Sequence, residues 1–213
     1  MALKAIKLGG VYQTEWDNRP IRVLACDEIE VHYDAWWPHL KKWGLSKLRG
    51  SATYYRIPCA LLRKKAKLLR VEPLTPAELA FHRPDLPLRI CRYQNVQWTK
   101  KKYATLKSFA EALKQLSPSI KIPDQGIALA LPAVSLQPFG PQGRSKRGVK
   151  VEAASEAGFT ELELLWHAHN VQAPLLKEWD QGVGLYRSGF ERGIPSYYLW
   201  GYYDRAGYLD PKQ

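Results

Sequence analysis

The alternation of residues 28–34 limits the possible folds of this chain more than any other feature. In the run EIEVHYD, apolar side chains occupy every second position, at Ile29, Val31 and Tyr33. The intervening positions hold Glu28, Glu30, His32 and Asp34. A period of two is typical of an antiparallel strand with one buried and one solvated face. We therefore expect a strand here, with its acidic side facing water.

The rest of the first 57 residues has the same character. The runs GGVYQTEW, PIRVLAC and SATYYRI are short, rich in Val, Ile, Tyr and Thr, and separated by turn-forming residues such as those of DNRP. About four strands in so short a stretch predict a small β-barrel or a strongly curled antiparallel sheet, of the size class of SH3 or OB domains. The basic run HLKKWGLSKLRGSA, residues 39–52, between two of these strands is expected to be a long loop with one helical turn.

Helical patterns follow the β-rich segment. The run CALLRKKAKLLR, residues 59–70, has apolar residues at helical spacing, and Thr75-Pro76-Ala77-Glu78 can form a capping box that opens a short helix. Residues 99–118 predict the clearest amphipathic helix, and a further helix is expected after Thr160, with Leu162, Leu165, Trp166 and His169 facing inward. Strands are expected at 88–98 and in a tyrosine-rich hairpin after residue 182.

These elements predict an α+β fold. Its parts are an N-terminal small β-barrel or curled antiparallel sheet, a basic helical middle, and a C-terminal helix plus β-hairpin. Residues 138–150 combine Pro, Gly and basic side chains with few apolar ones, which favours a linker or mobile loop. We therefore expect one unit over 1–137 and another over 151–213, or both packed as one domain.

Positive charge is concentrated in the middle of the chain. The net charge is +12, and residues 41–107 carry 17 basic and 3 acidic side chains. Such a basic zone is the electrostatic pattern of a protein that binds nucleic acid or another anionic surface. A solvated basic face, or one that meets an acidic protein, is the alternative.

Aromatic side chains are interleaved with the charge between residues 36 and 56. A positive groove with aromatic rings is a common way to hold single-stranded nucleic acid. Of the adjacent Trp36 and Trp37, one is expected to be structural, and Trp43 is the better candidate for stacking on a base. The predicted contacts are Lys41, Lys42, Trp43, Lys47, Arg49, Tyr54, Arg56, Arg63, Lys64, Lys65, Lys100, Lys101, Lys102, Arg144, Lys146 and Arg147.

A second hypothesis is a metal-dependent enzyme that acts on nucleic acid. Its candidate catalytic residues are Asp27, Glu28, Glu30 and Asp34, of which the last three would share a strand face, and Glu163 with His167. On a helix, His167 and His169 would point about 200° apart and could not share a metal. A third hypothesis is a protein-interaction module that uses exposed Tyr and Trp side chains.

The remaining signals favour binding over catalysis. The chain has no P-loop, GxGxxG, HExxH or GxSxG motif, and Cys26, Cys59 and Cys91 lack the spacing of a zinc site. We therefore expect no metal and no cofactor. Scattered cysteines and the lack of a signal-peptide pattern predict a cytoplasmic protein. The favoured function is nucleic-acid binding, to DNA or RNA with single strands preferred, as an accessory subunit of a larger nucleoprotein or genome-maintenance or defence complex.

Overall fold

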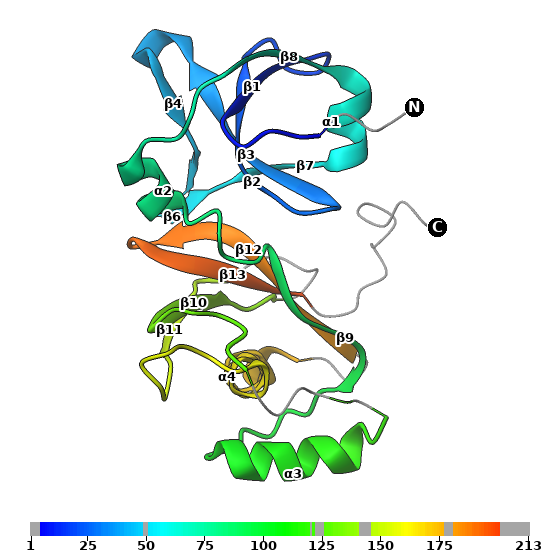
Figure 1. Cartoon of the computed structure of the whole chain (residues 1–213). Helices are drawn as coiled ribbons and strands as arrows, with labels where there is room; N and C mark the ends of the chain where they lie inside the picture. Colours follow the sequence, from blue (N-terminus) through cyan, green and yellow to red (C-terminus); the bar gives the residue numbers. More distant parts are fainter. Residues whose placement is uncertain are drawn as a thin grey trace. The chain divides into compact units, whose positions relative to one another are not determined.

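The computed structural model describes residues 5–48, 51–119, 121, 126–140, 146–176 and 181–200. Over these residues the chain is an α+β protein with four α-helices and two sheets of antiparallel or mixed pairing, which confirms the predicted fold class. The chain divides into two compact units, residues 1–88 and 89–213. Figure 1 draws the first from blue through cyan and the second from green to orange. Among the described helices, none is long and apolar enough to cross a membrane.

The first unit is built on an antiparallel sheet of short strands. Its central strands are β1 (Gly10–Thr14), β2 (Ile21–Cys26) and β3 (Glu30–Trp37), which lie in sequence order, with β8 (Ala66–Val71) next to β1. Two strands share the other edge of β3: β7 (Tyr55–Pro58) pairs with its first half and β4 (Lys42–Gly44) with its second. The four predicted β runs are therefore all present as strands.

Helix α1 (Cys59–Lys65) connects the two ends of this sheet. It follows β7, which pairs with β3, and leads into β8, which pairs with β1, so the chain passes from one edge of the sheet to the other (Figure 1). The expected helix over 59–70 is wrong beyond Lys65, because Ala66–Val71 form a ladder with Gly10–Thr14 instead. The pairings of the described strands form an open, curled sheet, and a closed barrel stays a prediction.

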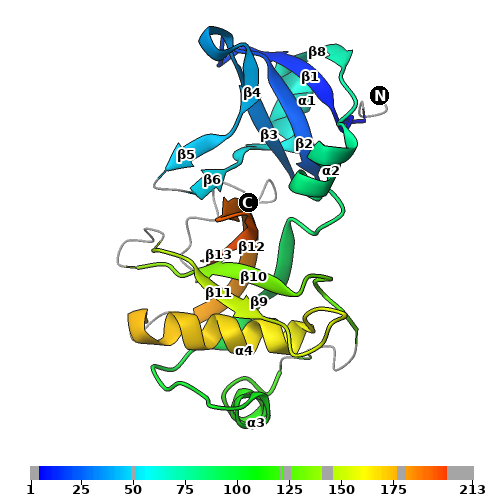
Figure 2. The ribbon, with the colours of Figure 1, turned by 90° about the vertical axis from the view of Figure 1, so that its left-hand side faces the viewer.

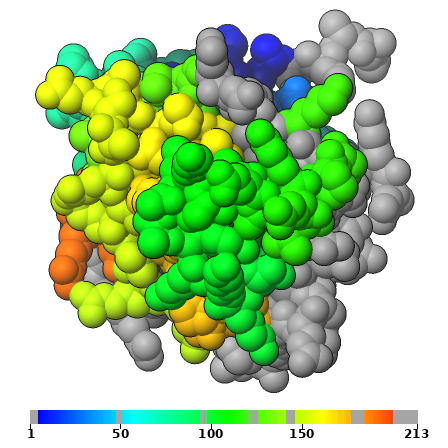
Figure 3. All heavy atoms as spheres, turned by 90° about the horizontal axis from the view of Figure 1, so that it is seen from below, coloured from blue at the N-terminus to red at the C-terminus, as the bar shows by residue number. Residues whose placement is uncertain are grey.

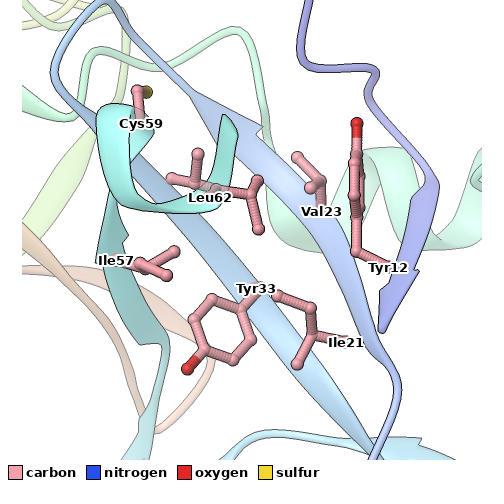
Figure 4. Close-up of a cluster of buried hydrophobic side chains, with 8 residues drawn as sticks. Tyr12, Ile21, Val23, Tyr33, Ile57, Cys59 and Leu62 are labelled. Carbon is pink, nitrogen blue, oxygen red and sulfur yellow. The ribbon is translucent and has the colours of Figure 1, made fainter. Parts of the chain in front are cut away.

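A hydrophobic cluster fills the concave side of the curled sheet. It contains Tyr12, Ile21, Val23, Val31, Tyr33, Ile57, Cys59 and Leu62. Figure 4 shows these side chains pointing toward one another from the strands and from α1. The expectation that Tyr33 faces inward is therefore confirmed, and Leu62 shows why the start of α1 is apolar on one side.

The opposite, acidic side of β3 is also buried. The expectation that this side faces water is therefore wrong. Glu30, His32 and Asp34 are 6%, 1% and 3% exposed. The short helix α2 (Pro76–His82) contributes Glu78 to the ion pairs of this side and His82 to its aromatic contacts. The predicted capping box opens α2: Thr75 Oγ1 accepts a hydrogen bond from the Glu78 N–H, and the Glu78 carboxylate accepts one from the Thr75 N–H. Alternation alone could not show this, because it is equally compatible with a second buried side that is polar.

The basic segment 38–51 is more ordered than the predicted loop. It holds a 3₁₀ turn, η1 (Pro38–Leu40), then β4, and then β5 (Ser46–Leu48), which forms a hairpin with β6 (Ser51–Thr53). Pro38 directly after Trp37 ends β3, since proline cannot donate to a strand ladder.

The second unit has a mixed sheet covered by helices. The order of its strands is β11 (Val149–Glu152), β10 (Ala133–Gln137), β13 (Ile194–Trp200), β12 (Gln181–Glu191) and β9 (Arg89–Gln97). Only the β10–β13 pairing among these is parallel. Helix α4 (Glu161–Gln172) lies against the sheet, and α3 (Leu106–Leu116) packs on α4 (Figure 2). A 3₁₀ turn, η3 (Ala173–Leu175), follows α4.

Several boundaries in the second unit differ from the expected ones. The helix expected over 99–118 begins only after Thr105, which caps it. On α4 the predicted Thr160 cap is present, but Leu162 and Trp166 are half-buried, whereas Leu164 and Ala168 are fully buried. The expected linker 138–150 joins β10 to β11, two paired strands of one sheet, so the structure places the division between units at residue 88 instead of 137.

Candidate nucleic-acid interface

The acidic residues of β3 are already engaged by cations of the protein itself. Arg22 of β2 donates two hydrogen bonds to Asp34, at 3.3 Å from Nε and 2.8 Å from Nη2, and its Nη2 lies 2.9 Å from a Glu78 oxygen. Glu30 Oε1 is 2.8 Å from His32 Nε2. Burial raises the pKa of Asp34 to about 6 and outweighs the opposing effect of Arg22. These contacts form a buried polar cluster beneath α2, which we call the β3 polar cluster.

The carboxylates proposed for metal catalysis are not gathered at one place. Asp27 accepts hydrogen bonds from the backbone N–H groups of Ile29 and Glu30 and so shapes the turn before β3. Glu28 is exposed, whereas Glu30 and Asp34 are buried. Within the described part of the chain, no group of three or more His, Cys, Asp or Glu side chains could hold a metal ion. Glu30 and Asp34 share one side of β3 as expected, whereas Glu28 lies before the strand begins and does not belong to that side.

The second proposed acidic pair belongs to the packing of α4. Glu163 accepts a hydrogen bond from the Ala154 N–H at 2.7 Å, and His167 Nε2 lies 3.9 Å from the same carboxylate. His169 Nε2 is 2.8 Å from the Lys101 carbonyl and its ring stacks on Trp98. Burial lowers the pKa of both histidines. Both are on a helix, as predicted, and their contacts are structural ones.

Trp43 and Tyr54, two predicted base-stacking residues, are packed within the first unit. The Trp43 ring lies under the Arg22 guanidinium at 4.9 Å, meets Trp36 edge to face, and donates from Nε1 to Glu72 at 3.0 Å. Tyr54 is 3% exposed, stacks on His32, and donates to the His82 carbonyl. The Tyr54 ring is thus not on the surface, and Trp43 extends the β3 polar cluster.

On the other side of β3, the half-exposed rings of Trp37 and Tyr55 and the exposed ring of Trp16 gather near the buried Tyr33. The Arg19 guanidinium lies 5.5 Å from the centre of the Trp37 ring and also contacts Tyr55, which stacks on Tyr33 at 5.5 Å. Trp16 contacts Tyr33 and is 41% exposed. We call Trp16, Arg19, Tyr33, Trp37 and Tyr55 the Trp37 cluster.

The Trp37 cluster is held rigidly by its loop. Asp17 forms a bidentate ion pair with Arg19 at 3.0 and 2.8 Å, and it also accepts from the Arg19 N–H. Trp37 Nε1 donates to the Gly44 carbonyl at 3.3 Å. His39 meets the Trp37 ring edge to face at 5.6 Å. Arg19 and the rings are therefore positioned before any ligand binds, which reduces the entropy cost of binding.

Exposed lysines lie beside this cluster. Lys42 is the cross-strand partner of Trp37, so the two side chains share a face of the sheet, and Lys41 precedes it. Lys47 on β5, Arg56 on β7 and Lys64 on α1 are exposed as well, although Arg56 is the cross-strand partner of His32 and lies on the side of the β3 polar cluster. These five cations have no ion pair with any carboxylate in the described ranges. By contrast, Lys65 pairs with Glu15, and Arg63 is half-buried.

The other predicted contacts belong to the second unit. Lys100, Lys101 and Lys102 are exposed in the segment before α3, and Lys101 Nζ lies 5.4 Å from the centre of the Tyr103 ring. Figure 3 shows this segment and α3, in green, on the surface of the second unit. Lys146 and Arg147 are exposed before β11. Arg49 and Arg144 lie outside the described residues.

The contacts predicted from the sequence include none of the five residues of the Trp37 cluster. Trp16, Arg19, Tyr33 and Trp37 lie outside the basic zone of residues 41–107, and Tyr55 lies within it between the predicted contacts Tyr54 and Arg56. The alternation of β3 distinguishes the two tryptophans. Trp37 is four residues after Tyr33 and lies on the same side of the strand, whereas Trp36 is two residues after Asp34 and lies on the other side.

Comparison of the chain with protein-family models, curated proteins and solved structures finds no match.

Proposed function

We propose that the first unit binds single-stranded nucleic acid through the Trp37 cluster and the lysines beside it. The observation that supports this most is the pairing of Lys42 with Trp37, because it puts an exposed ammonium group beside a half-exposed, rigidly held indole. Aromatic faces stack on bases while nearby cations neutralise phosphates, and each stacked base contributes about 1–3 kcal/mol.

The shape of the first unit is consistent with this function. We propose that the curled sheet and α1 together act as a small barrel, with α1 spanning the gap between β7 and β8. Small barrels commonly present one sheet face to an extended strand of nucleic acid. In this proposal the chain works as an accessory subunit of a nucleoprotein complex, and Lys100, Lys101, Lys102, Lys146 and Arg147 of the second unit supply further phosphate contacts.

The test is fluorescence anisotropy of the full chain with a labelled fifteen-residue oligo-dT, the matching oligo-U and a duplex, over a salt series. If about six phosphates are neutralised, log affinity falls against log salt with a slope of about −4 on single strands. We expect Trp37→Ala to weaken oligo-dT binding by about tenfold, the equivalent of about 1.4 kcal/mol for one lost stacking contact.

Two matched variants make this test specific. Phe81→Ala removes an exposed aromatic ring from α2, outside the Trp37 cluster, and should leave the affinity unchanged. Trp43→Ala should lower stability before it affects binding, because Trp43 contacts Arg22 and Glu72. Absence of binding to all three nucleic acids at 50 mM salt, or equal effects of Trp37→Ala and Phe81→Ala, would refute the proposal.

A further inference from the structure

Strand β8 is the last strand on its side of the first unit's sheet. It pairs with β1 along one edge, from Ala66 opposite Thr14 to Val71 opposite Gly10. In the described part of the first unit, no strand follows β8 in the order of the sheet. Unpaired N–H and C=O groups on such an edge are a template for adding another strand.

The two faces of β8 differ in chemistry. Leu68 lies opposite Tyr12, and Val71 lies opposite Gly10, so both are on the core-facing side of the sheet. Because β8 is the last strand, they are nevertheless 38% and 42% exposed. Lys67 lies opposite Gln13 and Arg70 opposite Val11, which places both on the other side. Arg70 is ion-paired with Glu72 on that side, whereas Lys67 has no ion pair among the described residues. One side of the β8 edge is therefore apolar, and the other is polar with the unpaired charge of Lys67.

Two further exposed apolar side chains lie on or next to β8. Leu69 stands at the register shift of the β1–β8 ladder and is 46% exposed. Helix α1, which contacts β8, adds Leu61 at 37% exposure. Single exposed apolar residues are ordinary, but four on adjoining elements form the kind of patch that marks an interaction site.

We propose that the outer edge of β8 binds an extended acidic segment of a partner protein by strand addition. In such a segment, apolar side chains at alternate positions would cover Leu68 and Val71. Acidic side chains between them would reach Lys67 and would compete with Glu72 for Arg70. Main-chain hydrogen bonds would provide the affinity, and the alternation would provide the specificity. This site is separate from the Trp37 cluster and does not depend on its function.

Charge and side-chain chemistry select this occupant over two others. A second copy of the chain would bring its own Lys67 and Arg70 on β8, and Lys64 on α1, close to those of the first copy. Like charges on facing strands oppose pairing. Nucleic acid gains nothing from Leu68, Leu69 and Val71, which offer no flat ring for a base. An acidic protein strand uses both sides of the edge.

The test measures binding of the full chain to two labelled ten-residue peptides, one that alternates valine with glutamate and one that alternates valine with lysine. We expect the glutamate peptide to bind at least tenfold more tightly. The double variant Leu68→Asp/Val71→Asp should lose at least tenfold of that affinity. Leu79→Asp, an equally exposed leucine on α2, should leave it unchanged. Binding of oligo-dT should be the same in all of these proteins.

Each alternative has its own outcome. Equal affinity for the two peptides, or no effect of the double variant, would overturn the proposal. Displacement of the peptide by oligo-dT would assign the edge to nucleic acid, and a wild-type dimer that Leu68→Asp/Val71→Asp dissociates in sedimentation would assign it to a second copy. If the double variant fails to fold by urea titration, Leu69→Asp at the register shift replaces it. Loss of oligo-dT binding with peptide binding retained would refute only the proposed function.

Discussion

Replacing Arg22 by methionine should destabilise the first unit in a way that depends on pH. Arg22 holds Asp34 by two hydrogen bonds and also contacts Glu78 and Trp43. Asp34 is 3% exposed, so without Arg22 its carboxyl group would stay buried with no cation beside it and would be driven toward its protonated form. Removing one member of a buried ion pair costs about 3–5 kcal/mol. We expect a loss of free energy of unfolding in that range at pH 7.

The pH dependence follows from the pKa of Asp34. The ordinary pKa of Asp34 is 3.8, and burial raises the folded value to about 6 even with Arg22 present. The contribution of Asp34 to the free energy of unfolding is therefore fully present below pH 3.8 and is lost as the pH rises through 6. Without Arg22 the folded pKa of Asp34 rises further, because the lowering effect of the guanidinium is lost. That change costs about 1.5 kcal/mol more at pH 7 and almost nothing at pH 5, where Asp34 is protonated in both proteins.

The assay is urea unfolding at pH 5 and pH 7, followed by hydrogen-exchange mass spectrometry of peptides from β2 and β3. These peptides report on the first unit alone. Arg56→Met, which removes an exposed guanidinium from β7, is the control and should change stability by less than about 0.5 kcal/mol. If Arg22→Met lowers the free energy of unfolding by the same amount at both pH values, or by more at pH 5, the role assigned to Asp34 is refuted.

Two further predictions concern the packing of each unit. Leu62→Ala should cost about 2–5 kcal/mol of unfolding free energy, because Leu62 is buried in the cluster of Figure 4. Leu61→Ala, at the exposed neighbouring residue, should cost less than about 0.5 kcal/mol. Urea titration of the two variants measures the difference. Burial lowers the pKa of His167, so protonation favours unfolding, and the second unit should lose stability as the pH falls below 6.5. His167→Gln should reduce that loss in thermal unfolding measured at pH 5 and pH 7, and an unchanged pH dependence would contradict the assignment.

Local sequence patterns predicted the positions of most helices and strands, because the starts of these elements depend on contacts between residues that are close in the sequence. The capping box of Thr75 and Glu78 and the Thr160 cap of α4 are formed by side chains three residues apart, so the sequence contains everything they need. The alternation of β3 likewise placed Tyr33 in the core. Such features are readable from one sequence because their partners are neighbours in the chain.

The burial of Glu30 and Asp34 could not be predicted in the same way. Their partners come from other elements: Arg22 lies on the neighbouring strand, and α2, which supplies Glu78, is more than 40 residues away in the chain. Alternation indicates that two sides differ in polarity, but it does not say whether the polar side meets water or a second layer of protein. The position of α2 decides that question.

The end of α1 at Lys65 shows a similar limit. The pattern CALLRKKAKLLR suits a helix throughout, and only the pairing of Ala66–Val71 with β1 selects a strand for its second half. Tertiary contacts commonly override local propensity in this way. The same misassignment hid the edge of β8, since a helical reading places Leu68, Leu69 and Val71 around a helix rather than on a sheet.

The β1–β8 ladder also has a consequence for how the first unit forms. It joins Gly10 to Val71, about sixty residues apart, whereas β2 and β3 are linked by a short turn. Contacts between distant residues form late, because the loop between them must be closed before they contribute. We therefore expect the β2–β3 hairpin to fold early and β8 to be the last strand to dock. During synthesis or refolding, the strand that presents the exposed leucines would then be the one that stays unpaired longest.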